Sequence, residues 1–292
     1  MRSSANALPA LALTLNALVW GCSWFPFRLL HQHGLHPLWA TVVIYALAVA
    51  VIAVLRPRAL AHLLRTPALW LLLLAAGTTN AAFNWAAATG DVVRVVLLFY
   101  LMPLWAVLLA RWLLHEPLTR AAGVRVLLAL AGAAVVLWPE GETGWPLPRS
   151  LPDWLGVLGG FSFALNNVLL RRAAHEPEDA RALAMFIGGA SVAGALAVVL
   201  GLQGSVPWPP APTLGWVPLT LGMGVAFLLS NLSLQYGATR LPANVTSVVM
   251  LSEVLFASAS AVALGAGALS PPLWIGGGLI VLAALLATLQ SR

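Results

Sequence analysis

Two stretches of the sequence repeat one pattern and decide how the rest of the chain is read. The first runs Tyr100-Leu-Met-Pro-Leu-Trp-Ala-Val-Leu-Leu109 and closes on His115-Glu-Pro-Leu-Thr119. The second runs Leu251-Ser-Glu-Val-Leu-Phe-Ala-Ser258 and closes on Ala266-Gly-Ala-Leu-Ser270, and it aligns with the first without a gap. Each copy is typical of a helix, a short turn and the start of another helix. The sequence therefore predicts an internal repeat.

The composition excludes a water-soluble globule. Of the 292 residues, 61% are hydrophobic and only 8% are charged, and the mean hydropathy is +0.91. An ordinary soluble domain is roughly 25% charged, and so apolar a chain lacks the polar side chains that a water-exposed surface needs. The solvent of this protein is therefore partly lipid.

Hydrophobic runs predict that the chain crosses the bilayer ten times. A membrane-spanning helix needs about 20 predominantly apolar residues, and breaks marked by proline, glycine or arginine separate runs of about this length. The predicted spans are 8–30, 38–55, 68–88, 92–114, 121–138, 153–171, 181–202, 214–236, 242–264 and 272–289. They leave only short tails and connections, so we expect no extramembrane domain.

The arginines predict the orientation in the membrane. The net charge of +6 and the pI near 11.0 would suggest nucleic acid as the partner of a soluble protein, but these arginines stand between apolar runs and form no basic stripe. Cytoplasmic loops collect arginine. With the N-terminus inside, three of the fifteen basic residues fall outside, namely Arg28, Arg94 and Arg149, and the other twelve fall inside. Both termini are therefore predicted to be cytoplasmic, with the bilayer as partner and no nucleic acid.

The repeat predicts two halves that cross the membrane in opposite senses. Trp20-Gly-Cys-Ser-Trp-Phe-Pro-Phe-Arg28 also resembles Phe163-Ala-Leu-Asn-Asn-Val-Leu-Leu-Arg171 in position. We divide the chain into a first five-helix repeat at 1–140, an outer connecting loop at 141–152 and a second five-helix repeat at 153–292. Because five is odd, the repeats are inverted, an arrangement in which secondary transporters place their substrate near the midplane. The predicted fold class is an all-α integral membrane protein of ten transmembrane helices around a central cavity.

Three groups of residues resemble the EamA-type carriers of the drug/metabolite transporter superfamily. They are Trp20-Gly21, the Pro103 segment with its Glu116-Pro117-Leu118 turn, and Leu251-Ser252-Glu253. Within the superfamily, the chain is most similar to the YddG-type amino-acid exporters. The resemblance implies a ten-helix basket in the bacterial inner membrane that exports amino acids, aromatic ones among them. The sequence departs from a symmetric pattern at Gly267, which stands where the first repeat has Glu116.

Glu253 is the one acidic or basic residue that falls near the middle of a predicted span. Ionisable groups in the hydrocarbon cost a few kcal/mol on insertion scales and are functional candidates by default. Two hypotheses stay open: Glu253 couples protons to transport or binds the substrate amine, or it only holds the repeat interface together through hydrogen bonds.

Side-chain amides supply most of the other candidate contacts. Spacings of four residues place them on common helix faces, and a neutral amide can both donate to a carboxylate and accept from an ammonium group. The alternative for each is an interhelical hydrogen bond, worth about 0.6 kcal/mol. The amide candidates are Asn80, Asn84, Asn166, Asn167, Asn231 and Gln235, and Asn16 continues a stripe with Trp20.

Aromatic residues complete the predicted site. Most of the 13 tryptophans lie near span ends, as in an interfacial belt, whereas Tyr100, Phe163 and Trp20 lie deeper. We predict that these three contact the substrate; core packing is the alternative for each. Possible hinges are Gly77, Pro103, Gly222 and Gly224, because glycine and proline loosen a helix.

Other motifs predict no additional chemistry. His31, His33 and His36 lie close together but are expected in a solvated outer loop, and we predict neither a metal site nor a cofactor. We expect Arg94 to pair with Asp91. An enzyme would need paired acids, an activated nucleophile or a metal cluster, which the predicted spans lack. The sequence therefore predicts a non-enzymatic secondary transporter that exports amino acids, with other small neutral metabolites or drugs as the alternative and protons as a possible coupling ion.

Overall fold

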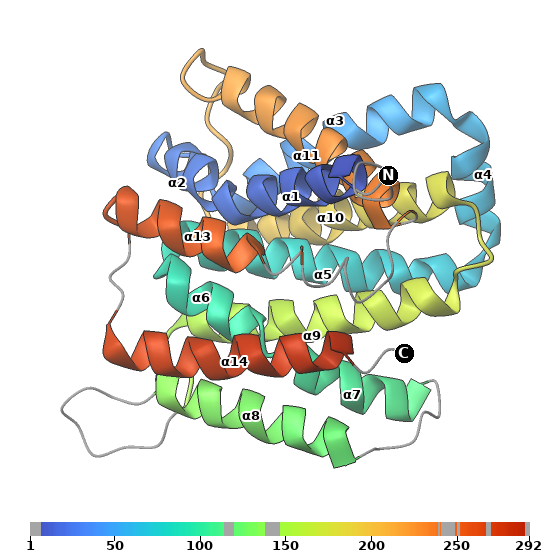
Figure 1. Cartoon of the computed structure of the whole chain (residues 1–292). Coiled ribbons are helices and arrows are strands. Elements are labelled where there is room, and N and C mark those ends of the chain that lie inside the picture. Colours follow the sequence, from blue (N-terminus) through green and yellow to red (C-terminus); the bar gives the residue numbers. More distant parts are fainter. Residues whose placement is uncertain are drawn as a thin grey trace.

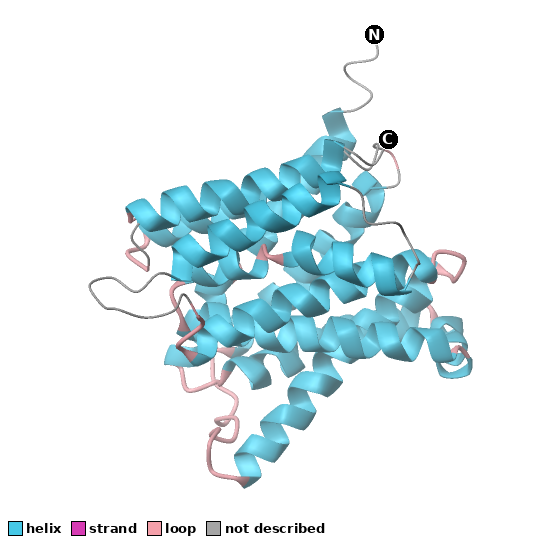
Figure 2. Cartoon of the chain, turned by 90° about the horizontal axis from the view of Figure 1, so that it is seen from below, coloured by secondary structure: helices cyan, strands magenta, loops and turns pink. Residues whose placement is uncertain are grey.

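Helices make up the protein throughout the part of the chain that the structure describes, and no strand occurs there. The computed structural model describes residues 7–113, 120–137, 147–238, 240, 249, 252–266 and 270–289. Most helices run alongside one another, joined by short loops (Figures 1 and 2). The helices are α1 (Ala7–Cys22), α2 (Trp24–Gln32), α3 (Pro37–Leu55), α4 (Pro57–Arg65), α5 (Pro67–Thr89), α6 (Val92–Phe99), α7 (Met102–Leu113), α8 (Arg120–Leu137), α9 (Leu151–Arg172), α10 (Glu178–Leu202), α11 (Val217–Ala238), α13 (Ser252–Ala263) and α14 (Pro271–Leu289).

Each of the ten ranges predicted to span the membrane contains helix, but fewer qualify as spans. By length and composition, five helical segments of the described chain can cross a membrane, or six if the bent pair α4 and α5 counts as one. The segment α9 is not among them, because amides and arginines near its end lower its hydropathy. The ten-span count and the inverted repeat remain predictions, as do the Glu116 turn and Gly267, which lie outside the described residues.

Proline begins several helices, as expected for a residue whose missing N–H costs nothing in the first turn. Pro37, Pro57 and Pro67 open α3, α4 and α5. The helix α4, which the sequence analysis treated only as a break, lies at an angle of 104° to α5. It therefore turns the chain between two spans without adding a crossing.

The predicted span at 92–114 is interrupted near its middle. Tyr100 and Leu101 form a turn between α6 and α7, where the Leu101 N–H donates to the Leu98 carbonyl at 3.2 Å. Pro103 follows in the first turn of α7. Discontinuous helices of this kind line the substrate sites of many transporters.

Long-range packing joins helices from the two predicted halves. The helix α1 packs against α11 and α13, whereas α9 packs against α5, α6 and α7. The helix α5 also packs against α10, and α8 packs against α14. The start of α1 and the end of α14 lie at the same end of the bundle (Figure 1).

Candidate functional site

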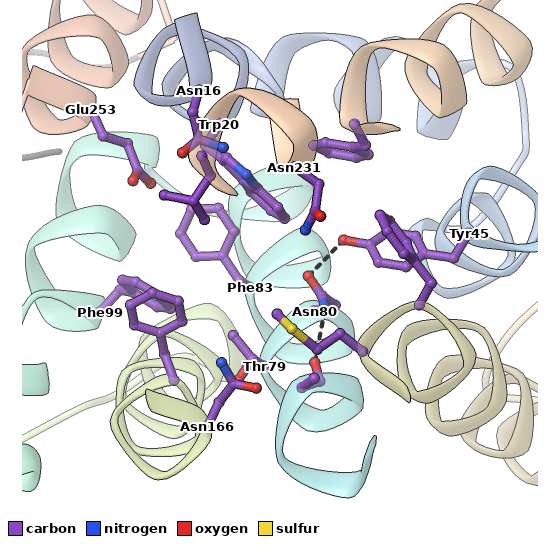
Figure 3. Close-up of a pocket in the computed structure, with 16 residues that line it drawn as sticks. Asn16, Trp20, Tyr45, Thr79, Asn80, Phe83, Phe99, Asn166, Asn231 and Glu253 are labelled. Atoms are coloured by element: carbon purple, nitrogen blue, oxygen red, sulfur yellow. Dashed lines mark hydrogen bonds between the residues drawn. The ribbon is translucent and has the colours of Figure 1, made fainter. Parts of the chain in front are cut away.

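A central pocket lies where helices of both predicted halves meet (Figure 3). It encloses about 850 Å³ of space free of protein atoms, its open mouth included. Its walls come from α1, α3, α5, α6, α9, α10, α11 and α13. The residues that line it are Asn16, Trp20, Tyr45, Ala76, Thr79, Asn80, Phe83, Phe99, Phe163, Asn166, Met185, Phe186, Phe227, Asn231, Leu234 and Glu253.

One aromatic group of the pocket centres on Phe227 of α11. The Phe227 ring centroid lies 4.6 Å from that of Trp20 and 5.8 Å from that of Tyr45. Phe186 of α10 packs against Tyr45 at 5.5 Å. Rings at these distances, tilted to one another, stabilise their arrangement beyond the area they bury. The group joins α1, α3, α10 and α11.

A second aromatic group centres on Phe99, at the end of α6. Its ring centroid lies 4.9 Å from Phe83, 5.3 Å from Phe163 and 6.0 Å from Tyr100. The α9 backbone approaches closely here, because a Cβ atom on Gly160 would collide with the Phe99 carbonyl oxygen. Glycine at this position lets α9 carry Phe163 and Asn166 to the pocket.

The polar side chains of α5 that line the pocket form hydrogen bonds within the protein. The Tyr45 hydroxyl donates to Asn80 Oδ1 at 2.6 Å, and Asn80 Nδ2 donates to the Ala76 carbonyl at 2.8 Å. The Thr79 hydroxyl donates to the Ala75 carbonyl at 2.8 Å. Asn80 therefore orders Tyr45 as well as facing the pocket.

Hydrogen bonds fix the orientation of the Asn16 amide in the lining of the pocket. Its Nδ2 donates to the carbonyl and hydroxyl oxygens of Ser230 at 2.9 and 2.6 Å. Because a carbonyl can only accept, these bonds determine which end of the amide is which. The opposite atom, Oδ1, is buried and finds no partner among the described residues.

Asn166 and Glu253 add two further polar side chains to the lining of the pocket. Asn166 is 2% exposed, and its Oδ1 has no partner within the described chain. Glu253, in the first turn of α13, points its carboxylate into the pocket (Figure 3). Its Oε2 accepts a long hydrogen bond of 3.4 Å from the Tyr100 hydroxyl.

The structure brings most of the predicted site residues together, but not all of them. Trp20, Asn80, Phe163, Asn166, Asn231 and Glu253 line the pocket. Tyr100 lies behind it and reaches it through Glu253. Asn84 is buried and donates to Thr41 at 3.1 Å instead, and Asn167 lies on an exposed face of α9. The Gln235 side chain lies outside the described part.

The predicted hinge residues occupy different environments. A Cβ atom on Gly77 would collide with the Gly188 carbonyl oxygen, so this glycine permits close packing of α5 on α10. On Gly224 it would lie 2.6 Å from Leu47, whereas on Gly222 it would meet nothing within 4 Å. Pro103 adjoins the turn at residues 100–101, and its side chain is outside the described part.

The prediction that Arg94 pairs with Asp91 is wrong for the side chain. Asp91 instead accepts the Arg94 backbone N–H at 2.9 Å and caps α6. The Arg94 guanidinium binds Asp153 of α9 at 2.8 and 3.1 Å and the Val136 carbonyl at 2.7 Å. Because the Asp91 carboxylate is hydrogen-bonded to the backbone N–H of Arg94, it does not pair with the guanidinium. The guanidinium instead links α6, α8 and α9.

The three neighbouring histidines do not share one environment. His31 and His33 are exposed, as a solvated loop predicts, but His36 is buried. Its Nδ1 accepts the Leu38 N–H at 3.3 Å and caps α3. Burial, with a smaller contribution from His31, lowers the pKa of His36 to about 4. It is therefore a neutral cap at pH 7.

Several pocket residues were missed from the sequence. Three of them are Tyr45, Phe186 and Phe227. They lie in apolar runs in which the spacing of hydrophobic residues does not distinguish pocket-lining positions from core positions. Tyr45 carries the clearest signal, since it is the one tyrosine of its span and a buried phenol needs a partner. Asn16 was recognised in the sequence because it forms a stripe with Trp20, and in the structure it lines the pocket.

Comparisons with known proteins agree with this architecture. The EamA-like transporter family model matches residues 7–138. A solved structure titled only "Crystal structure of protein" has a TM-score of 0.61 and 23% sequence identity, covering 100% of this chain and 98% of that one, and at this identity it shows the fold alone. A search of curated proteins finds no match. The chain is thus a multi-pass membrane protein whose residues 7–138 match the model of the EamA-like transporter family.

Proposed function

We propose that this protein is a secondary transporter that exports amino acids, including aromatic and other neutral ones, across the bacterial inner membrane. One observation carries the proposal: the central pocket combines amide side chains, a carboxylate and two aromatic groups. Members of the matching family are transporters rather than enzymes. The pocket then serves as the binding site for a small solute.

The chemistry of the pocket suits a small organic solute with an amine and an apolar side chain. Asn166 and Glu253 provide polar contacts, while Phe163 and Trp20 provide ring surface. No arginine or histidine is among the described lining residues. Phosphorylated solutes would require such cationic groups, so they fit less well.

We further propose that ten helices form two inverted repeats and work by alternating access. The helix contacts support this. In the predicted repeat α1 corresponds to α9, α11 to α5, and α13 to α6–α7. The packing of α1 on α11 and α13 therefore corresponds to the packing of α9 on α5 and α6–α7, and both are observed. In the same way α8 corresponds to α14, and these two helices also contact each other. A pseudo-twofold axis through the pocket follows from this correspondence.

Counterflow in proteoliposomes loaded with unlabelled amino acid tests the proposal. We expect labelled phenylalanine and other neutral amino acids to accumulate against their gradient. Asn166→Ala should slow uptake about tenfold, since a polar contact to a charged group is worth about 1.5–3 kcal/mol. Asn167→Ala is the matched control on the same helix and should transport like the parent, because Asn167 lies away from the pocket. Absence of counterflow for every amino acid tried would contradict the proposal.

Export of other small neutral metabolites or drugs is the alternative, and competition by such solutes in the same assay would favour it. Coupling to protons is tested with and without a pH gradient. If Glu253 carries the proton, the parent should concentrate phenylalanine in response to the gradient, and Glu253→Gln should exchange it without responding. An unchanged response in Glu253→Gln would leave Glu253 only a structural or binding role.

A further inference from the structure

We infer that the short helix α4 lies in the plane of the membrane surface and binds anionic phospholipid headgroups through Arg58 and Arg65. This site lies outside the central pocket, and it does not depend on which solute the pocket takes. It requires only that the chain is a multi-pass membrane protein. The ligand class is the headgroup phosphate of an anionic lipid.

The helix α4 runs across the bundle rather than along it. Its axis lies at 104° to that of α5, which contains the predicted span 68–88. In Figure 1 α4 lies across one end of the bundle, the end at which α1 starts and α14 finishes. Because α5 is predicted to cross the bilayer, α4 is roughly parallel to the membrane surface. Amphipathic helices in this orientation lie at the boundary between headgroups and acyl chains.

Contacts with the bundle fix which faces of α4 point outward. Ala59 and Leu63 are four residues apart and both 2% exposed, and they pack in a cluster with residues of α5, α9 and α10. On an adjoining face, His62 Nε2 lies 2.5 Å from Glu176 Oε2 in the connection between α9 and α10. These two anchors set the rotation of α4 about its own axis, so its remaining faces meet the surroundings of the protein.

One outward face of α4 is apolar. Leu60 and Leu64 are four residues apart and therefore share a face, and they are 39% and 60% exposed. Trp70, in the first turn of α5, is also 49% exposed. Tryptophan is enriched at the depth of the headgroups. Acyl chains at this depth would cover the two leucines, which water would leave unfavourably exposed.

A second outward face of α4 is basic. Arg58 and Arg65 are seven residues apart, which is about two helical turns, so they share a face about 130° around the helix from the leucines. Both are exposed, and Arg56 adds a third exposed arginine where the helix begins. Among the described residues, these guanidinium groups form no hydrogen bond or ion pair. Arg94, by contrast, is held by Asp153.

Acids of the protein do not neutralise this basic face. The sequence contains no aspartate or glutamate before Asp91. Glu176, which does lie against α4, is in contact with His62 and with His175. The free arginines therefore complement an anion from outside the protein. Arginine binds phosphate oxygens with two parallel hydrogen bonds, and basic residues beside a bilayer are attracted to its anionic lipids.

Lipid binding to the purified full-length protein in a neutral detergent tests the inference. Native mass spectrometry compares dioleoylphosphatidylglycerol with dioleoylphosphatidylcholine, and we expect the anionic lipid to bind at least about tenfold more tightly. The double variant Arg58→Gln with Arg65→Gln should weaken phosphatidylglycerol at least about tenfold, because each basic residue near an anionic surface contributes about fivefold. Its affinity for phosphatidylcholine should not change.

The matched control removes two exposed arginines elsewhere on the predicted inner side, Arg111→Gln with Arg172→Gln. It should bind phosphatidylglycerol like the parent. Equal losses in the two double variants would show that binding follows net charge, and equal binding of the two lipids by the parent would show no preference for anionic headgroups. Either result overturns the inference. Displacement of phosphatidylglycerol by millimolar inorganic phosphate at matched ionic strength would also overturn it, since the site would then take soluble anions.

Spin labels in lipid nanodiscs test the position of α4 independently. In a Cys22→Ala background, a label at Leu64→Cys should be relaxed more by oxygen, which concentrates in the acyl region, than by an aqueous nickel complex. A label at Arg58→Cys should show a larger share of relaxation by nickel. The control is His33→Cys in the exposed loop after α2. If Leu64→Cys is as accessible to nickel as His33→Cys, α4 lies in water, its face is open to a protein partner, and the lipid assignment is wrong.

Discussion

Asp153 shows how a single residue depends on distant partners. Its carboxylate is only 5% exposed. It accepts two hydrogen bonds from Arg94 and one from the Arg149 backbone N–H at 3.1 Å. A carboxylate buried to this degree is tolerated because its charge is paired and hydrogen-bonded. The pair ties the start of α6 to the start of α9.

Replacing one partner of this pair should destabilise the protein strongly. Arg94→Met leaves Asp153 without its cation, and we expect a loss of about 2–3 kcal/mol, or about 5 °C in melting temperature. The double variant Arg94→Met with Asp153→Asn should recover part of this loss, because no unpaired charge remains. Differential scanning fluorimetry in detergent measures both.

Arg56→Met is the control for loss of an arginine, since Arg56 is exposed between α3 and α4. It should melt within about 1 °C of the parent, as surface substitutions usually change stability by less than about 0.5 kcal/mol. Equal melting temperatures for Arg94→Met and Arg56→Met would show that the buried pair does not stabilise the fold.

At the scale of elements, glycine determines how closely helices approach. Gly77 faces the backbone of Gly188 where α5 crosses α10, and Gly132 faces that of Gly276 where α8 crosses α14. A Cβ atom on Gly132 would lie 2.6 Å from the Gly276 carbonyl oxygen. Small residues at helix interfaces let backbones pack closely where lipid supplies no hydrophobic drive. Glycine in such a helix serves packing, which differs from the hinge role predicted for Gly77.

Alanine substitutions separate the two roles. Gly77→Ala should lower stability by about 1–3 kcal/mol, because the added methyl group meets backbone that cannot move aside. Gly222→Ala adds its methyl group to open space on α11. It should preserve or slightly raise stability, since alanine favours helix by about 0.5–1 kcal/mol.

Transport then identifies the hinge. If Gly222 bends during the cycle, Gly222→Ala slows counterflow severalfold while its melting temperature does not fall. Normal counterflow in this variant would remove Gly222 from the hinge residues. A melting temperature for Gly77→Ala equal to that of the parent would remove Gly77 from the packing residues.

The whole molecule combines a charge asymmetry with a repeated packing pattern. The predicted inner side of the membrane holds twelve arginines and the predicted outer side three. The start of α1 and the end of α14 lie at one end of the bundle, as an even number of spans requires (Figure 1). Together these features favour both termini in the cytoplasm.

Cysteine labelling tests this orientation, because Cys22 is the single cysteine of the chain. In a Cys22→Ala background, His33→Cys lies on a predicted outer loop and His175→Cys on a predicted inner one, and both positions are exposed. An impermeant maleimide should label His33→Cys in intact cells and His175→Cys only after lysis. The opposite pattern would invert the topology.

The sequence by itself determined the solvent, the helices and the depth of the main candidates. Hydropathy and arginine placement depend on local composition, which is why every predicted span contains helix and why Glu253, Asn166 and Phe163 were recognised as deep residues. A run apolar on all faces, however, does not show which face meets a cavity. Tyr45 and Phe227 could therefore not be told from core residues.

Tertiary structure decided which deep polar groups are free and which are used. Asn80, Asn84 and Asn166 look alike in sequence, yet Asn80 orders Tyr45 and Asn84 donates to Thr41, whereas Asn166 lines the pocket and its amide makes no hydrogen bond among the described residues. The choice of Asp153 over Asp91 by Arg94 arose in the same way. A hydrogen bond depends on where two side chains meet in space, and for residues far apart in the chain only helix packing determines that.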